Sequence, residues 1–267
     1  MVIDAVMYSG EYEALLLRLH ELADVVDAFV VVEAPQTFTG AAKPLYFAER
    51  DRARLGALSD RILYVTTPLP RTDDPWARET HQRNAMITGL EGLHDDDVVL
   101  IGDVDEIPNA DAVRGAARLL GGSLQQLGFD QDLCLYFVNN HCTTARWRGT
   151  QAVTAAYLAA VTPQGVRDRR NVAPALLNAG WHFGSLLGDE GAARFERKLA
   201  SFSHAEECAP FATPENVAAA IDAGRDVSGR QDILFRADLT PKAEDYPAWL
   251  WEHRHDMAHL FAPGTTL

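Results

Sequence analysis

The sequence is poor in cysteine, in basic residues and in long apolar runs, and each shortage excludes a class of protein. Only three of its 267 residues are cysteines, namely Cys134, Cys142 and Cys208. Their number is odd and their spacing does not match a zinc site. Cys134 lies within an apolar run, which favours a small buried side chain. We therefore expect reduced thiols and a cytoplasmic protein.

Basic residues are outnumbered, with 24 Lys and Arg against 38 Asp and Glu and a formal net charge of -14. A surface of this charge repels phosphate backbones, so we expect no nucleic-acid partner. A bound divalent cation can still bring a phosphorylated small molecule to an acidic site.

No apolar run approaches the roughly 20 residues that a bilayer-spanning helix needs. The first residues, MVIDAVMYSGEYE, lack a basic segment followed by a long apolar stretch. We therefore expect neither a signal peptide nor a transmembrane segment. A phosphate-binding loop of the form G-x-x-x-x-G-K-[ST] is also missing, which argues against a nucleotidyl- or phosphotransferase.

Short β-branched runs alternate with segments of helical periodicity. The pattern predicts strands over 2–7, 28–32, 62–65, 98–101 and 133–138, and helices over 11–23, 76–93, 109–121 and 190–202. This alternation is typical of an α/β fold with a mostly parallel central sheet flanked by helices. No linker is visible, so we predict one domain over 1–267, in which residues from about 230 to 267 pack as a helical extension.

Three acids gather where the strand over 98–101 ends, in IGDVDEIPNA. Asp103 and Asp105 are two positions apart, which places both carboxylates on one face of an extended strand. Mg²⁺ and Mn²⁺ take oxygen ligands and leave positions open for substrate phosphates. Such an ion would stabilise a departing diphosphate. Alternatively, the acids form a solvated loop in which Glu106 or Asp111 favours the N-terminus of the next helix.

Several segments, in this order, give the sequence a resemblance to glycosyltransferase family 17. They are LADVVDAFVVVEA with KPLYF, DPWARETHQRNAM, DVDEIP, GWHF, KLASFSH and YPAWLWEHRHDMAHLF, and together they cover most of the chain. The resemblance implies a GT-A type fold and an inverting transferase. The characterised relatives use UDP-N-acetylglucosamine (UDP-GlcNAc) and a divalent metal such as Mn²⁺. The chain is shorter than the animal members and differs from them in the middle, so the carbohydrate or glycoconjugate acceptor is not implied.

The resemblance also implies roles for individual residues near the acidic segment. Asp105 is the first candidate for a direct metal ligand and a catalytic residue. Asp103 would hold the metal through water or contact the donor ribose. His182, in GWHF, is a candidate for a further metal ligand, because neutral imidazole suits Mn²⁺. A hydrogen-bonded core histidine is the alternative.

Five further side chains are candidates for contact with the donor. Glu33 ends a strand, where its carboxylate could accept hydrogen bonds from uracil or ribose. Lys43, Arg83 and Lys198 could meet diphosphate oxygens, or could form ordinary surface ion pairs. Trp181 could stack on a sugar ring, although a buried tryptophan is the more common case.

An inverting transferase needs a general base to take the proton of the acceptor hydroxyl. Glu190, in GDEG, is favoured by its position in the family-like segment. An acid at a helix start is the alternative interpretation. The rival carboxylates are Glu206, Asp130, Asp132 and Asp232.

A basic island spans residues 146–170 of this acidic chain and contains Arg146, Arg148, Arg167, Arg169 and Arg170. It could bind an anionic acceptor or the donor phosphates, or it could balance the acidic surface. The leading hypothesis is a metal-dependent N-acetylglucosaminyltransferase-like enzyme. The alternatives are a metal-dependent nucleotidyl- or phosphotransferase and a non-catalytic carbohydrate-binding protein.

Overall fold

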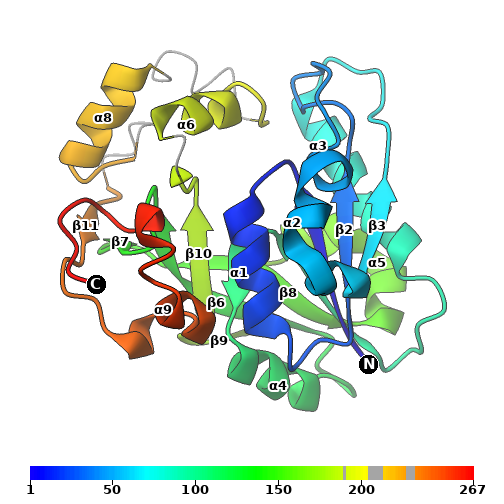
Figure 1. Ribbon diagram of the computed structural model, residues 1–267. Helices are drawn as coiled ribbons and strands as arrows, with labels where there is room; N and C mark the ends of the chain where they lie inside the picture. Colours follow the sequence, from blue (N-terminus) through cyan, green and yellow to red (C-terminus); the bar gives the residue numbers. More distant parts are fainter. Residues whose placement is uncertain (189–190, 204–212, 227–231) are drawn as a thin grey trace.

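A computed structural model describes residues 1–188, 191–203, 213–226 and 232–267 of the chain (Figure 1). The predicted α/β class is confirmed, since helices cover both faces of one central sheet. The first four strands pair in parallel in the spatial order β4-β1-β2-β3. They are β1 (Val2–Tyr8), β2 (Ala28–Glu33), β3 (Ile62–Thr66) and β4 (Val98–Asp103).

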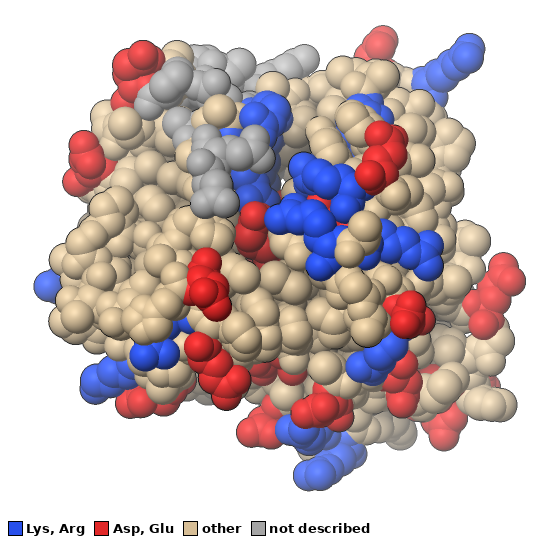
Figure 2. Space-filling model, in the orientation of Figure 1, with Lys and Arg blue, Asp and Glu red and all other residues tan. Residues whose placement is uncertain are grey.

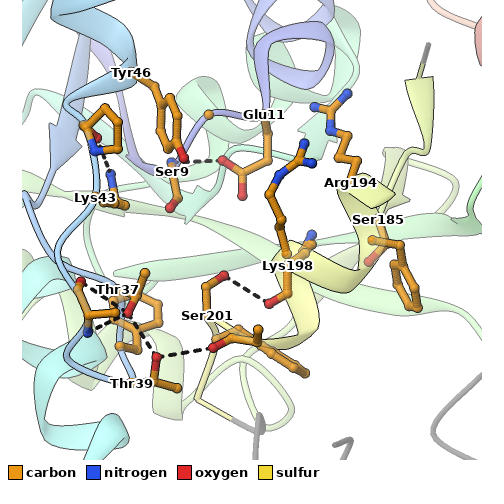
Figure 3. Close-up of a pocket in the computed structure, with 18 of the residues that line it drawn as sticks. Ser9, Glu11, Thr37, Thr39, Lys43, Tyr46, Ser185, Arg194, Lys198 and Ser201 are labelled. Carbon is orange, nitrogen blue, oxygen red and sulfur yellow. Dashed lines mark hydrogen bonds between the residues drawn. The ribbon is translucent and has the colours of Figure 1, made fainter. Parts of the chain in front are cut away.

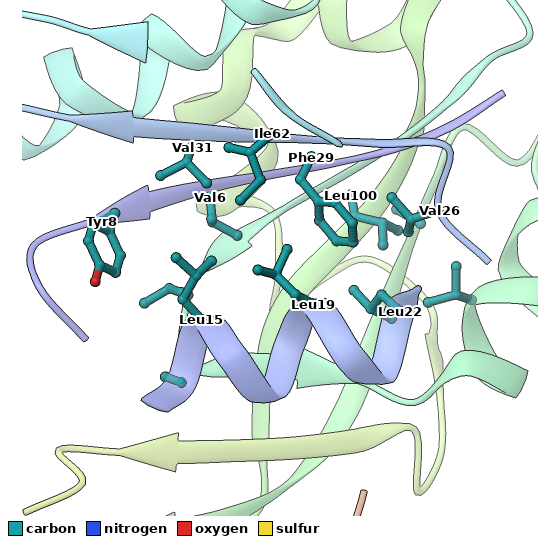
Figure 4. Packing of buried hydrophobic residues seen from close by; sticks show 14 of the residues in the cluster. Val6, Tyr8, Leu15, Leu19, Leu22, Val26, Phe29, Val31, Ile62 and Leu100 are labelled. Carbon is teal, nitrogen blue, oxygen red and sulfur yellow. The ribbon is translucent and has the colours of Figure 1, made fainter. Parts of the chain in front are cut away.

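Alternation along these strands sends side chains to two separate apolar clusters. On one face, Val6 and Val31 pack against the leucines of α1 (Tyr12–Leu22), as Figure 4 shows. On the other face, Ala5 and Val30 pack against Met86 and against α5 (Ala155–Asp168). The strands are therefore buried on both sides, as their continuous apolar runs predicted.

The predicted helix over 76–93 is shorter than expected. The α-helix α3 (Pro75–Asn84) ends early, and a 3₁₀ turn follows at Ala85–Gly89. A Cβ atom at Gly89 would lie 2.5 Å from Val30 Cγ1, so the backbone touches the sheet at this position. This close approach requires glycine and a change from regular helical geometry.

Beyond β4 the sheet becomes mixed. Strand β8 (Trp147–Thr154) is antiparallel to both β4 and β6 (Gln126–Leu135). Strand β10 (Gly180–Gly184) is parallel to β6 and antiparallel to β5 (Glu106–Pro108). The expectation of a mostly parallel sheet therefore holds only as far as β4, because apolar patterning does not reveal strand direction.

The remaining elements are short and complete the two halves of the fold. They are a π turn (Phe47–Asp51), α2 (Arg52–Leu55), α4 (Ala110–Leu119), β7 (Asn140–Cys142), β9 (Ala175–Leu176), α6 (Ala192–Leu199), α8 (Pro214–Asp222), β11 (Phe235–Ala237), α9 (Ala248–Glu252) and 3₁₀ turns at Gly56–Arg61, Ala243–Asp245 and Ala258–Leu260. Asn109 caps α4 as predicted, because its Oδ1 atom accepts a hydrogen bond from the Ala112 amide. The predicted strand over 133–138 ends at Leu135, where Tyr136 takes a positive φ of 69°.

The C-terminal segment packs against the first helix. The Trp249 ring stacks on His20 of α1, and Leu250 and Tyr246 join an apolar cluster with Phe183. Within the described ranges, every helix is too short or too polar to cross a bilayer.

Candidate active site

A cavity of about 620 Å³ opens beyond the carboxyl ends of β1 and β2, beside the end of β4. Ligands of open α/β sheets bind at this edge. Figure 3 shows Lys43 and Tyr46 on one side of the space and Arg194 and Lys198 on the other. Asp105 also lines the cavity, so the acidic segment meets it directly.

The cavity lining is basic, although the whole chain is acidic. Five cationic side chains line it, together with the two acids Glu11 and Asp105. The cations are Lys43, Arg50, Arg194, Arg197 and Lys198. Figure 2 shows Lys and Arg side chains gathered beside a hollow near the centre of this face. This lining suits an anionic ligand such as a diphosphate.

Asp105 lies between the side chains of Lys198 and His182. Its Oδ2 atom is 3.2 Å from Lys198 Nζ, and its Oδ1 atom is 3.6 Å from His182 Nε2. Burial alone would raise the pKa of Asp105, but Lys198 and His182 outweigh burial and hold the pKa far below its ordinary value. The carboxylate is therefore ionised at neutral pH.

Asp103 is held by two buried arginines. Its oxygens accept hydrogen bonds from Arg83 Nη2 at 3.1 Å and from Arg167 Nη2 at 2.8 Å. Burial raises its pKa, but Arg167 and Arg83 outweigh burial and lower the pKa to about 2. Glu106 is fully buried and accepts hydrogen bonds from Arg167 and from Trp147 Nε1. The solvated-loop alternative is therefore wrong for these acids.

The arrangement of Asp105 and His182 fits a divalent ion. Their facing atoms are 3.6 Å apart, which is too long for a hydrogen bond. Two ligands of one ion, each about 2.1 Å from it, lie roughly 3 Å apart or slightly more. The buried Nδ1 atom of His182 has no hydrogen-bond partner in the described part of the chain. Mg²⁺ and Mn²⁺ commonly take few protein ligands and complete their shell with water and substrate oxygens.

The structure does not bring the three predicted metal ligands together as one group. Asp103 faces Arg83 and Arg167, whereas Asp105 faces Lys198 and His182. Asp103 is thus positioned to anchor the end of β4 rather than to share an ion with Asp105.

A different trio gathers on the opposite face of the sheet. Across the described ranges, the one group of three potential ligands within 4.8 Å of one another is Asp132, Cys134 and His141. His141 Nδ1 lies 2.6 Å from Asp132 Oδ2, and Nε2 lies 3.1 Å from the Tyr246 hydroxyl. These ligand types could hold a divalent ion. Asp132 and Cys134 flank Leu133, the residue paired with His182, so their side chains point away from His182, and His141 of β7 pairs with Cys134.

Glu33 is not placed to contact a donor. Its side chain is completely buried. Its oxygens accept hydrogen bonds from Lys43 Nζ, the amides of Tyr46 and Phe47, and the Tyr64 hydroxyl, at 2.8–3.1 Å. Glu33 therefore anchors the loop that forms one wall of the cavity, and Lys43, which does line the cavity, is oriented by it.

Arg83 and Trp181 also differ from their predicted roles. Arg83 is buried and forms hydrogen bonds to Asp103, Glu79 and Gln164. Its charge therefore pairs with acids inside the protein. Trp181 precedes His182 on β10 and projects to the opposite face. Its Nε1 atom donates a 2.7 Å hydrogen bond to the Asp245 carbonyl, and its ring stacks near Phe183. Neither residue lines the cavity.

The candidate bases are placed as follows. Glu190 and Glu206 lie outside the described residues. Asp130 pairs with Arg146, Asp132 pairs with His141, and Asp232 is exposed.

Sequence reasoning proposed Lys43 and Lys198 for this role but missed the three cavity cations Arg50, Arg194 and Arg197. Arg197 and Lys198 follow Arg194 by three and four positions on α6, which places each of them beside Arg194 on the helix surface. This spacing was a readable signal. Arg50 gave no such signal, because it reaches the cavity through the fold of the segment after β2.

Comparison with known proteins agrees with the resemblance found in the sequence. The profile described as Glycosyltransferase family 17 matches residues 1–235. The human β-1,4-mannosyl-glycoprotein 4-β-N-acetylglucosaminyltransferase is 34% identical over 143 residues, which covers 51% of this chain and 27% of the human protein. The protein of the same name from Rattus norvegicus is also 34% identical, with 51% and 26% covered. The match thus spans about a quarter of the length of these relatives.

Two solved structures share parts of the arrangement at low identity. A 4-diphosphocytidyl-2C-methyl-D-erythritol synthase from Anaerococcus prevotii is 11% identical, with a TM-score of 0.37, and the alignment covers 66% of this chain and 87% of that one. A mycobacterial protein is 14% identical, with a TM-score of 0.40 and coverage of 75% and 74%.

Proposed function

The chain belongs to glycosyltransferase family 17, and from this premise we propose a metal-dependent, inverting transfer from a nucleotide sugar to a carbohydrate or glycoconjugate hydroxyl. UDP-GlcNAc is the proposed donor, because the curated relatives are named as N-acetylglucosaminyltransferases. The observation that carries the proposal is the position of Asp105. It is an ionised carboxylate in the wall of a cavity that cations otherwise dominate.

The donor diphosphate occupies the cation-lined cavity in this proposal. Lys198 would donate hydrogen bonds to diphosphate oxygens, and its ammonium group lies beside Asp105 at the cavity wall. Lys43 and Arg194 approach from opposite sides of the space. Fixed cations of this kind stabilise the charge that develops on a departing diphosphate without reorganising during the reaction.

Asp105 and His182 are the residues that would hold Mn²⁺ or Mg²⁺. The bound ion supplies further neutralisation of the leaving diphosphate. The chain itself positions this pair. Arg83 and Arg167 fix Asp103, and Glu106 accepts a 3.0 Å hydrogen bond from the Asp103 amide, so the turn that carries Asp105 is held from both sides.

Glu190 is the proposed general base. Its carboxylate would take the proton of the acceptor hydroxyl while the hydroxyl oxygen attacks the anomeric carbon from the side opposite the diphosphate. Inversion follows from this single displacement. Glu190→Gln should therefore remove transfer and leave binding of UDP unchanged.

Thermal unfolding with UDP and UDP-GlcNAc, each with and without Mn²⁺, tests the proposal. A ligand at a hundredfold excess over its dissociation constant adds about 2.7 kcal/mol of stability. We expect a rise in Tm only when nucleotide and metal are both present. Asp105→Ala should remove the rise, whereas Asp111→Ala, an exposed acid on α4, should keep it.

Retention of the metal-dependent rise and of turnover by Asp105→Ala would overturn the site. Product analysis checks the reaction class separately. Free UDP with a new glycoside supports transfer, whereas pyrophosphate or a phosphoester supports the nucleotidyl- or phosphotransferase alternative.

A further inference from the structure

Three side chains of the paired strands β6 and β7 converge on the face of the sheet away from His182. They are Asp132 and Cys134 of β6 and His141 of β7, whose potential ligand atoms all lie within 4.8 Å of one another. Cys134 and His141 are directly opposite in the antiparallel ladder, so their side chains share a face. Asp132 is two positions from Cys134 and shares that face too. Strand pairing creates this group, which is why the linear spacing of the cysteines did not reveal it.

The distances within this group approach those of a zinc site. Around a tetrahedral zinc ion, with bonds of about 2.3 Å to sulfur and about 2.0–2.1 Å to nitrogen, these two ligand atoms lie about 3.5 Å apart. Cys134 Sγ lies 3.4 Å from His141 Nδ1. Asp132 Oδ2 is closer to Nδ1, at 2.6 Å, and has to move back by roughly 0.8 Å to match a zinc-bound oxygen. A small rotation of one partly exposed carboxylate therefore completes the geometry.

His141 is oriented by its second ring nitrogen. Its Nε2 atom lies 3.1 Å from the Tyr246 hydroxyl, on the side of the ring away from Nδ1. With the ring proton on Nε2 and donated to the Tyr246 oxygen, Nδ1 presents its lone pair toward Cys134 and Asp132. Metal-binding histidines almost always donate their second N–H to a fixed partner in this way. A hydrogen bond from Nδ1 to Asp132 would explain two members of the group, whereas a bound ion explains all three.

An ion can reach the group from solvent. The side chains of Asp132 and His141 are 29% and 22% exposed, whereas Cys134 is fully buried behind them. Arg146 is the neighbouring cation, with Nη1 3.7 Å from Asp132 Oδ1, but it pairs more closely with Asp130. The Oδ2 atom of Asp132 therefore remains available on the side of His141.

We propose that Asp132, Cys134 and His141 bind Zn²⁺, with water in the fourth position. Thiolate ligands select zinc over Mg²⁺ and Mn²⁺, and imidazole and carboxylate ligands also suit zinc. Binding releases the thiol proton of Cys134 to solvent, because the thiolate is the form that coordinates. The site is separate from the pair Asp105 and His182, and it does not depend on the transferase function.

The bound ion would join the mixed part of the sheet to the C-terminal segment. It connects β6 directly to β7 and, through the contact between His141 and Tyr246, to the residues before α9. Tyr246 and Cys134 already belong to one apolar cluster with Leu250 and Phe261. The role of the ion is therefore structural.

Titration of the whole chain with Co²⁺, a spectroscopic substitute for Zn²⁺, tests the site under reducing conditions. A thiolate bound to Co²⁺ gives a charge-transfer absorption that carboxylate and imidazole ligands do not give. Asp105 and His182 therefore cannot produce this signal. The proteins compared are the wild type, Cys134→Ala, Asp105→Ala and the matched control Cys142→Ala. Cys142 is also buried, but it packs with Leu133 on the other face of the two strands.

We expect the absorption in the wild type, in Asp105→Ala and in Cys142→Ala, and we expect added Zn²⁺ to displace it. Cys134→Ala should lack it. His141→Gln keeps the thiol and should weaken Co²⁺ binding by more than about tenfold, since losing even a partner that only orients a metal ligand costs that much.

Lack of the absorption in the wild type overturns the proposal, and so does absorption that survives in Cys134→Ala. Loss of the absorption in Cys142→Ala would place the ligand on the other face, and loss in Asp105→Ala would show that the site is not separate. Either result also overturns the proposal. If Cys134→Ala does not fold, wild-type affinity for Co²⁺ in His141→Gln has the same meaning. None of these measurements involves a nucleotide, so they decide the zinc site independently of the transferase function.

Discussion

Arg167 Nη1 lies 2.7 Å from both carboxylate oxygens of Glu106, while Nη2 of the same side chain lies 2.8 Å from Asp103 Oδ2. One guanidinium therefore joins the end of α5 to two acids of the DVDE segment. These acids repel one another, but the buried arginine charges that pair with them offset the repulsion. The contacts also fix the turn on which Asp105 stands.

Replacing Arg167 should be strongly destabilising. Arg167→Met leaves Glu106 and Asp103 buried without their main cation, and breaking a buried pair in this way costs about 3–5 kcal/mol. Arg167→Lys should retain only part of the stability, because an ammonium group has a single nitrogen, whereas the guanidinium bonds the two acids through two nitrogens. Urea unfolding at pH 7 measures the change. Arg169→Met, an exposed neighbour, should change stability by less than about 0.5 kcal/mol; a similarly small effect of Arg167→Met would contradict the buried role.

Asp103 should make the protein sensitive to acid. Its folded pKa of about 2 lies below its ordinary value of 3.8. The stabilisation is therefore complete above about pH 4 and is lost as the pH falls toward 2. The shift corresponds to about 2 kcal/mol. Unfolding free energies between pH 5 and 2 should fall less steeply in Asp103→Asn than in the wild type, and equal slopes would show that Asp103 is not the responsible group.

Lys198 should control donor affinity. Lys198→Met removes the ammonium group beside Asp105 and keeps much of the apolar stem. We expect UDP to bind about 10- to 100-fold more weakly, since hydrogen bonds to charged groups contribute about 1.5–3 kcal/mol. Titration calorimetry with Mn²⁺ present provides the measurement. Lys242→Met, which changes an exposed lysine outside the cavity, is the matched control, and unchanged affinity in Lys198→Met would remove Lys198 from the donor site.

Trp181 should affect stability rather than donor use. Trp181→Phe loses the hydrogen bond to Asp245 and should lower the unfolding free energy by about 1 kcal/mol. The KM for UDP-GlcNAc should stay the same, because the ring packs on the face away from His182. A raised KM with unchanged stability would instead support stacking on the donor sugar.

The first half of the fold could be predicted because its signals are local. The runs that form β1, β2, β3 and β4 are each bounded by turn residues, and Asn109 marks a helix start by its own chemistry. The strand end before Asp105 indicated a ligand-facing position, and Lys43 was a predicted contact for a diphosphate. Both line the cavity.

The structure differs from the predictions where segments distant in the sequence determine the surroundings of a residue. Glu33 and Asp105 look alike in sequence, as acids after buried strands. Only the loop that returns to Glu33 with the Tyr46 and Phe47 amides makes its carboxylate structural. Trp181 and His182 are neighbours, and which of them faces Asp105 depends on the register between β10 and β6. Local pattern carries no information on that register.

The place of β1 at the centre of the parallel strands also governs how quickly the native state can form. Val2 pairs with Val98, a partner 96 positions further along the chain. Strands β1 and β4 can therefore pair only after the two ends of a long segment have been brought together. Closing such loops costs entropy before the contacts return any free energy, and chains with distant pairings fold slowly. We therefore expect a stabilising substitution at the β1–β4 seam to accelerate folding as well as to slow unfolding.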